Sequence, residues 1–193
     1  MKHILFIVGS FRNNSFNRQL ANVAEEILKN RFHISYLDFK DIPYMNQDIE
    51  INGQQATDSE ERISSVVRVR EEVIKANGIW VFTPEYNRSY PGLLKNLFDW
   101  LSRPMDVSNF TNPTAAQGKK ITLSGAGGKN RTISCRDKLV DLLEYMKMNV
   151  MKEPQTGIEL GMEAWVKGEF HLNEQQLSEL KEQAEKFASF VGE

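Results

Sequence analysis

The sequence predicts an α/β fold in which a doubly wound parallel sheet carries helices on both faces. Five candidate strands alternate with helical segments along the chain, and no domain-sized break interrupts them. The runs at 4–8 and 79–82 are continuously apolar, which is typical of parallel strands buried on both faces. Right-handed helical crossovers join such strands. Because 193 residues suit one domain, we expect a single domain over 1–193.

The first half of the chain contributes two strands and two helices. An apolar run predicts a strand at 3–8. Apolar residues that recur among polar ones at helical spacing predict a helix at 15–29. A second, short strand is expected at 33–37. Residues 41–58 are polar and rich in residues that favour turns, so we expect them to be irregular. A stripe of valine and isoleucine then predicts a helix at 59–76.

The second half continues the alternation. A buried strand is expected at 78–83, a helix at 91–101, an irregular segment at 102–118 and a strand at 120–124. Three further elements complete the chain, namely a helix at 130–147 with a leucine stripe, a weakly signalled strand at 149–153 and a helix at 174–191 capped by Asn173.

Composition excludes several classes of protein. The net charge of −2 and the sequence pI near 6.0 argue against a nucleic-acid binder, which usually presents a strongly basic face. No apolar run approaches the roughly 20 residues of a membrane span. The single cysteine, Cys135, excludes an internal disulfide, and the N-terminal residues show no signal-peptide pattern. We therefore expect a cytoplasmic protein that binds neither nucleic acid nor membrane.

Three loops follow predicted strands at the edge of the sheet where such folds bind ligands. They are the first loop (9–17), the second loop (83–91) and the third loop (124–130), and all are enriched in small or polar residues. In doubly wound sheets, ligands bind at the carboxyl ends of the strands, near the switch point in strand order. The convergence of three such loops predicts a binding site there.

Each loop suggests a different part of a ligand. In the first loop, Gly9 permits a tight exit from the strand, while hydroxyls, amides and Arg12 lie at a helix N-terminus that favours phosphate. In the second loop, Pro84 and Tyr86 offer a rigid ledge with an aromatic face, suited to a planar heterocycle. The third loop is nearly free of bulky side chains, so its backbone can approach a ring closely.

Two motifs in these loops carry a family resemblance. The first is Gly9-Ser10-x-Arg12-x-x-Ser15-x-Asn17, and the second runs from Pro84-Glu85-Tyr86-Asn87 through Pro91-Gly92 to Asp99-Trp100. With both motifs at this spacing, the chain resembles the NAD(P)H-dependent FMN reductase family from residue 3 to about 145. That family includes quinone, azo-dye and chromate reductases. The resemblance implies a flavodoxin-like, five-stranded parallel sheet in the order 2-1-3-4-5.

The resemblance also implies cofactors and site residues. The cofactor is bound FMN, and NADH or NADPH is the electron donor. Residues of the first loop hold the FMN phosphate, and these are Ser10, Arg12, Ser15, Phe16 and Asn17. Residues of the other two loops border the isoalloxazine ring, and these are Pro84, Glu85, Tyr86, Asn87, Ser124, Gly125, Ala126 and Gly127. The third loop departs from the family pattern at Lys129-Asn130. No catalytic side chain is expected, since flavin carries the hydride chemistry itself.

The function implied is that of an oxidoreductase with a ping-pong cycle. NAD(P)H reduces FMN and leaves, and a small acceptor such as a quinone, an azo compound or free flavin then takes the electrons. The family usually forms homodimers. Helix 91–101 is apolar on more than one face, which favours burial against a second subunit, so we expect a homodimer or a higher homo-oligomer.

Simpler interpretations of the same residues stay open at this point. Ser10 and Ser15 could merely cap a helix, Arg12 could be a surface charge, and Cys135 is expected to be a packing residue. No carboxylate and histidine cluster suggests a metal. Two other functions share the predicted fold, namely an electron-carrying flavodoxin and a non-enzymatic FMN-binding regulator. A flavodoxin would usually show a Thr-rich phosphate loop and marked acidity, and neither occurs here.

Overall fold

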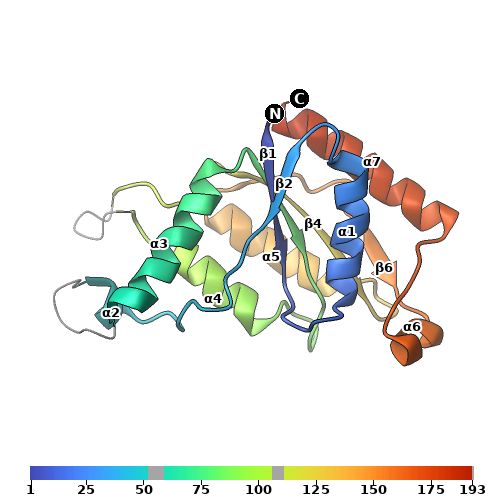
Figure 1. Cartoon of the computed structure of the whole chain (residues 1–193), viewed down its shortest axis with the longest axis horizontal. Coiled ribbons are helices and arrows are strands. Elements are labelled where there is room, and N and C mark those ends of the chain that lie inside the picture. The colour runs from blue at the N-terminus through green and yellow to red at the C-terminus, as the bar shows by residue number, and fades with distance from the viewer. Residues whose placement is uncertain (52–58, 106–110, 193) are drawn as a thin grey trace.

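A computed structural model describes residues 1–51, 59–105 and 111–192. Its centre is a parallel sheet of six strands in the order β2-β1-β3-β4-β5, with β6 paired to the end of β4 (Figure 1). The strands are β1 His3–Val8, β2 His33–Tyr36, β3 Gly78–Phe82, β4 Lys120–Gly127, β5 Asn149–Val150 and β6 Gly157–Glu159. The helices are α1 Phe16–Leu28, α2 Gln47–Ile51, α3 Ser59–Lys75, α4 Gly92–Leu101, α5 Ile133–Tyr145, α6 Met162–Lys167 and α7 Glu174–Val191.

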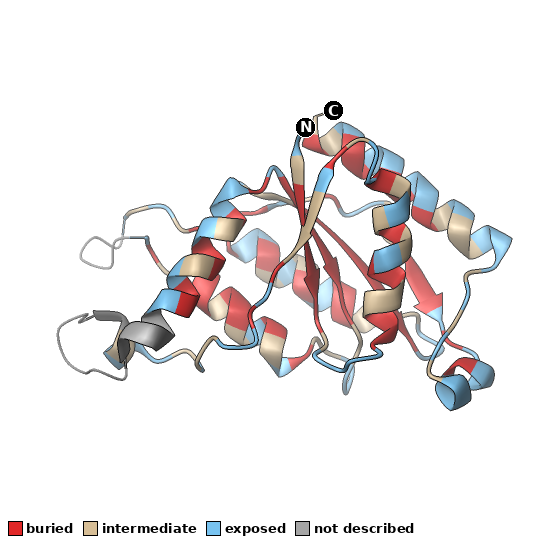
Figure 2. Ribbon diagram, in the orientation of Figure 1, coloured by how far each residue is buried: buried red, intermediate tan, exposed pale blue. Residues whose placement is uncertain are grey.

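Helices cover both faces of the sheet because alternate side chains of each central strand point to opposite sides. In β1, Phe6 packs into a core with α1 and α7, whereas Ile7 packs into a second core with α3, α4 and α5. Figure 2 shows the buried residues of the helices turned toward the sheet. β1 and β3 are almost wholly buried, as expected for strands covered on both faces. The doubly wound architecture and its predicted strand order are confirmed.

Apart from small shifts of element ends, the structure differs from the predicted elements at β4, β6, α6 and α2, and β5 is shorter than predicted. The strand predicted at 120–124 continues to Gly127, because β6 pairs with its last residues and extends the ladder. β6 and α6 were not predicted, since both are too short to show a periodic pattern. α2 lies inside the segment 41–58 that was expected to be irregular. Residues 52–58 of that segment, and 106–110 of the segment 102–118, lie outside the described residues.

Helix α4 buries its apolar surplus within its own chain. Trp100 is only 3% exposed, and its indole Nε1 donates to the carbonyl of Pro43 at 2.8 Å. The amide of Asn96 donates to the same carbonyl at 2.9 Å, so the segment after β2 lies across this helix. On the other side, the guanidinium of Arg70 donates to the carbonyl of Trp100 at 3.0 Å. The argument that this helix needs a second subunit is therefore wrong, and dimerisation stays a prediction.

Helix α7 anchors the far side of β4. Asn173 caps it in a reciprocal capping box with Gln176, as predicted for the cap. Further along, the fully buried amide of Gln183 donates to Thr122 Oγ1 at 2.8 Å and accepts from the Ser124 hydroxyl at 2.8 Å. No helix in the described parts of the chain combines the length and apolar character that crossing a bilayer requires.

Candidate functional site

The three predicted loops meet at the carboxyl ends of β1, β3 and β4, at the lower edge of the sheet in Figure 1. β1 and β3 are neighbours in register, and so are β3 and β4. The first and third loops are also tied together directly, because Asn17 Oδ1 accepts from the backbone N–H of Ala126 at 2.8 Å. The same amide donates to the carbonyl of Ala126 at 3.1 Å. The side chain of Asn17 therefore holds α1 against β4 through two hydrogen bonds.

The first loop leaves donors free at the start of α1. Ser15 is the N-cap and is buried, yet its hydroxyl makes no hydrogen bond to the backbone of the helix. The first turn carries no acidic side chain that would compete for its N–H groups. A helix N-terminus in this state favours an anion, since its N–H groups and its dipole are both uncompensated. Ser10 lies at the other end of the loop, where its Oγ is 3.4 Å from the backbone N of Arg12.

The side chain of Arg12 packs on the aromatic ring of Phe16. Its guanidinium carbon lies 4.5 Å from the centroid of the Phe16 ring, at cation–π distance. Phe16 is only 5% exposed and meets Trp165 edge-on at 5.2 Å between centroids, with Phe170 at 6.0 Å. Phe16 therefore positions the charged side chain above it. The supporting rings come from α6 and the segment after it, which sequence reasoning missed because no periodic pattern marks them.

The second loop is a tight two-residue turn. Tyr86 and Ser89 exchange backbone hydrogen bonds of 2.9 and 3.0 Å, and the two residues between them, Asn87 and Arg88, have positive φ. This combination is typical of a type I′ turn. The turn leaves Tyr86 55% exposed at the edge of the loop. An exposed aromatic side chain on a rigid turn can border a planar ring.

Glu85 joins the second loop to the start of α5. Its Oε2 accepts from the backbone N–H of Cys135 at 2.9 Å, and its Oε1 accepts from the side-chain amide of Asn130. A carboxylate at a helix N-terminus interacts favourably with the dipole. Glu85 therefore fixes the second loop against the third. The carbonyl of Pro84 accepts from the Thr83 hydroxyl at 2.8 Å and from the Cys135 thiol of α5 at 3.5 Å.

The third loop is shorter than predicted, because Ser124 to Gly127 belong to β4. The Ser124 hydroxyl lies in the core, where it accepts from Trp80 Nε1 at 3.0 Å and donates to Gln183. A Cβ on Gly125 would stand 2.4 Å from the carbonyl of Thr83, so this glycine is required by strand pairing. The expectation that these two residues lie in an open loop is wrong. Ala126 is buried under Asn17, and Gly127 alone of the four reaches the strand end.

Cys135 lies behind the second loop and is wholly buried. Burial raises the pKa of its thiol to about 11, and the carboxylate of Glu85 acts in the same direction, while a hydrogen bond with Thr83 opposes it. The thiol is therefore protonated at neutral pH. A protonated, buried thiol is a poor nucleophile, so Cys135 is a packing residue of the site.

The site as a whole fits a phosphorylated planar ligand. Uncapped N–H groups, a serine hydroxyl that does not cap the helix and a supported arginine suit a phosphate, and the second loop with the end of β4 suits a ring edge. A flavin mononucleotide has this shape and charge. The geometry defines a class of flavodoxin-like proteins that bind a flavin nucleotide at the carboxyl edge of the sheet.

Comparisons with known proteins give the family. The sequence profile described as "NADPH-dependent FMN reductase" matches residues 2–163. A quinone reductase of Pseudomonas putida is 30% identical over 189 residues, covering 97% of this chain and 94% of that protein. A 2-hydroxy-1,4-benzoquinone reductase of a Burkholderia species is 31% identical over 153 residues, covering 79% of this chain and 75% of that one. The chain belongs to the NADPH-dependent FMN reductase family.

A solved structure agrees with this assignment. FerB of Paracoccus denitrificans, a flavoenzyme described as an NAD(P)H:(acceptor) oxidoreductase, matches with a TM-score of 0.81 and 25% sequence identity. The match covers 99% of this chain and 97% of that one. The protein is therefore an FMN-dependent oxidoreductase that uses NAD(P)H, on the flavodoxin-like fold predicted from its sequence.

Proposed function

We propose that this protein passes electrons from NAD(P)H through bound FMN to a small acceptor of the quinone type. The observation that carries the proposal is the pairing of an uncapped α1 N-terminus at Ser15 with the rigid second loop across the same sheet edge. Similarity to two quinone reductases supports a quinone as acceptor. Azo compounds and free flavin are the alternatives that the family resemblance allows.

The proposed FMN site comprises residues from all three loops. Ser10, Arg12 and Ser15 hold the phosphate, with the N–H groups of the first turn of α1. Pro84 to Asn87 and Gly127 border the ring. Ser124, Gly125 and Ala126 lie in the strand behind it, and Phe16 and Asn17 act by holding Arg12 and β4 in place.

The protein's own groups bind and orient the cofactor. Bound FMN supplies the hydride and electron transfer chemistry. Arg12 and the α1 dipole balance the phosphate charge, and Glu85 fixes the second loop at the start of α5. The backbone of the second loop presents hydrogen-bonding groups to the edge of the ring. The exposed side chain of Tyr86 borders the opening through which the donor and the acceptor reach the ring. No side chain is required to act as a nucleophile.

A ping-pong cycle is proposed because one ring face serves the donor and the acceptor in turn. The test is steady-state kinetics at several acceptor concentrations, for which double-reciprocal plots should be parallel. Under anaerobic conditions, NAD(P)H alone should bleach the flavin, and a quinone should restore its colour. Intersecting plots, or bleaching that requires the quinone, would contradict the shared-site cycle. Tyr86→Gly should impair turnover more than it impairs FMN binding.

The same measurements separate the two other functions. An electron-carrying flavodoxin would oxidise NAD(P)H slowly without a separate reductase, and a regulator would bind FMN with negligible turnover. We further propose a single FMN-binding domain over 1–193, a cytoplasmic location and a homodimer, the last on the strength of the family resemblance. Light scattering of the FMN-loaded protein at micromolar concentration tests the homodimer, and a monomeric mass would contradict it.

A further inference from the structure

A cavity lies between the first loop and the end of β2, on the side of the loop away from β4. Its volume is about 320 Å³, and the residues that matter here are Ser10, Arg12, Arg18, Tyr36, Asp38 and Lys40. It shares Ser10 and Arg12 with the proposed FMN phosphate site and extends from there toward the end of β2, away from Ser15 and Asn17, which do not line it. We call it the basic cavity.

The charges of the basic cavity favour an anion. Arg12, Arg18 and Lys40 face it together with one carboxylate, that of Asp38. Within the described residues, none of these three cations lies within ion-pair distance of a carboxylate. Asp38 turns its Oδ1 to the backbone N–H of Lys40, at 3.3 Å. Because Arg12 also belongs to the proposed FMN phosphate site, Arg18 and Lys40 are the cations left for a second ligand, and they exceed the charge of Asp38 by one.

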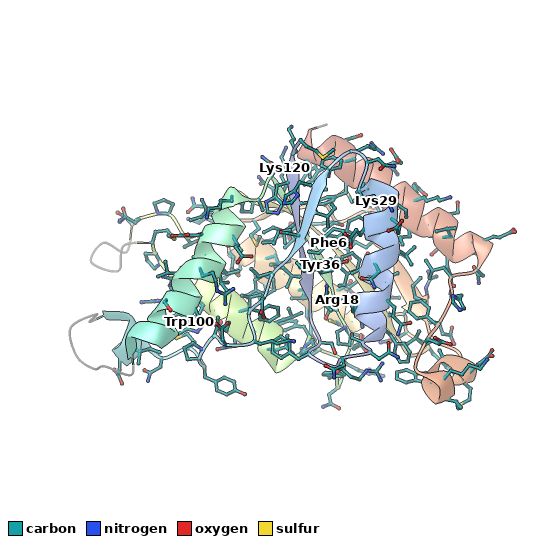
Figure 3. All side chains as sticks on the ribbon, in the orientation of Figure 1. Phe6, Arg18, Lys29, Tyr36, Trp100 and Lys120 are labelled. Carbon is teal, nitrogen blue, oxygen red and sulfur yellow. The ribbon has the colours of Figure 1, made fainter. Side chains whose placement is uncertain are left out.

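Arg18 is held in place rather than free in solvent. Its guanidinium carbon lies 3.9 Å from the centroid of the Tyr36 ring, and Figure 3 shows the two side chains together between α1 and the end of β2. The Tyr36 hydroxyl in turn donates to Glu25 Oε2 at 2.7 Å, which fixes the ring from behind. Stacking fixes the orientation of the planar guanidinium, whose forked N–H donors suit phosphate oxygens.

A second cavity adjoins the basic cavity and reaches the start of α4, directly after the second loop. Its volume is about 270 Å³, and it shares Phe11, Phe39 and Lys40 with the basic cavity. Its other end is lined by Gly92 and Asn96, at the start of the helix that directly follows the second loop. The lining is more apolar there, with Ile42, Tyr44 and Leu93. We call it the apolar cavity.

An aromatic ring stands where the two cavities meet. Phe11 is 39% exposed, and Phe39 supports it from the core at 5.0 Å between ring centroids. A partly exposed ring on a fixed base offers a stacking surface for a purine. The two adjoining cavities thus extend from the start of α4, past an aromatic ring, to the cations Arg18 and Lys40.

We propose that the basic cavity binds the 2′-phosphate of NADPH, with the adenine beside Phe11 and the nucleotide lying along the apolar cavity toward the FMN ring. This inference rests on the proposed function, because it assigns the adenosine end of the donor. A phosphate monoester carries nearly two negative charges at neutral pH and can pair with both Arg18 and Lys40. NADH lacks this group, so the cavity favours NADPH over NADH.

The competing assignment is the ribose of NADH. A carboxylate at the end of the second strand can accept hydrogen bonds from ribose hydroxyls, and Asp38 occupies that position. Arg18 and Lys40 outnumber it, and its Oδ1 already accepts a backbone N–H. The charge balance therefore favours the phosphate, and the experiment below separates the two assignments.

The experiment measures binding to the FMN-loaded protein by isothermal titration calorimetry, with 2′,5′-ADP and 5′-AMP as probes. Neither probe carries nicotinamide, so the readout does not depend on turnover. We expect 2′,5′-ADP to bind at least tenfold more tightly than 5′-AMP. Arg18→Gln and Lys40→Gln should each weaken 2′,5′-ADP about tenfold and leave 5′-AMP within about twofold. Arg12 is not varied, because it also belongs to the proposed FMN site.

Control variants show whether the loss of 2′,5′-ADP binding is specific to the cations of the cavity. Lys29→Gln removes a cation from the far end of the same helix, outside the cavity, and should leave both probes unaffected. Arg18→Lys should restore part of the binding lost in Arg18→Gln. Thermal unfolding and the absorbance of bound FMN show whether each variant is folded and loaded.

The results also separate this inference from the proposed function. Equal binding of the two probes, or variants that leave 2′,5′-ADP binding unchanged, would overturn the phosphate site even if NAD(P)H reduces the flavin. A loss of 5′-AMP binding in Asp38→Asn, without any effect of Arg18→Gln or Lys40→Gln, would also overturn the phosphate site. It would show that the cavity binds a ribose instead. Preferential 2′,5′-ADP binding that is lost in the cation variants would support the site, even if the acceptor proves not to be a quinone.

Discussion

The carboxylate of Glu85 accepts a hydrogen bond from the backbone N–H of Cys135 at 2.9 Å. A residue of the second loop thus caps the helix that follows the third loop, and the side-chain amide of Asn130 donates to the same carboxylate. Two loops that are separated by β4 and α4 in the chain are thereby held at a fixed distance. The site is rigid at this point because one carboxylate satisfies donors from both sides.

Glu85→Ala should destabilise the protein by about 1–2 kcal/mol, because it leaves helix α5 without its cap and removes a favourable charge from the positive end of the dipole. FMN affinity should fall as well, since the second loop loses its fixed position. Urea unfolding and FMN titration measure the two effects. The matched control is Glu144→Ala near the other end of α5, which loses only an exposed ion pair with Lys152. Equal stability of the two variants would contradict the capping role.

Arg12→Ala should weaken FMN binding by about 1.5–3 kcal/mol, because it removes a charge-assisted contact to the phosphate. Riboflavin has the same ring and no phosphate, so its affinity should change far less. Titration of the apoprotein with both flavins measures the difference. If the two ligands lose affinity equally, Arg12 does not contact the phosphate. Phe16→Leu removes the ring beneath the guanidinium and should show the same preference for riboflavin, to a smaller extent.

Arg88→Gly should stabilise the apoprotein by about 1 kcal/mol, because Arg88 has a φ of 58° in a turn position that glycine adopts without steric cost. Arg88→Ala is the matched control, since it removes the same side chain but keeps the Cβ that makes this backbone conformation unfavourable. Urea unfolding at neutral pH measures both variants. A gain of stability in Arg88→Ala equal to that of Arg88→Gly would show that the side chain, and not the backbone, is the source of strain.

The raised pKa of Cys135 predicts a loss of stability at high pH. Burial raises the pKa of this thiol from 9.0 to about 11, so the folded protein holds the proton more tightly than the unfolded chain does. The contribution is fully present below about pH 9 and is lost as the pH rises toward about 11. The unfolding free energy of the native protein should therefore fall more steeply over this range than that of Cys135→Ala, which serves as the control for other titrating groups.

Thiol alkylation gives an independent check of the same prediction. At pH 8, iodoacetamide should modify Cys135 only slowly in the folded protein and rapidly in urea, because the thiol is buried and protonated. Rapid modification of the folded protein would contradict both the burial and the raised pKa.

The sequence by itself determined the architecture and the place of the site. The apolar strands and the helix stripes are strong periodic signals, so β1, β3, α1 and α7 lie close to their predicted bounds. The two motifs placed the first and second loops at one sheet edge, because the carboxyl ends of parallel strands meet there. The predicted order of the five main strands followed from the family resemblance, and the structure has that order.

Only the tertiary structure decided which residues of these loops stay available to a ligand. Ser124 is an exposed-looking serine in the sequence, but its hydroxyl is used in the core by Trp80 and Gln183, which are 44 and 59 residues away along the chain. Such partners leave no local pattern. Helix α4 looks too apolar for a single chain, yet the segment around Pro43 covers Trp100. In the same way, the basic cavity exists only because Arg18 and Lys40 meet across the end of β2, since charges on separate elements form a site only when the fold brings them together.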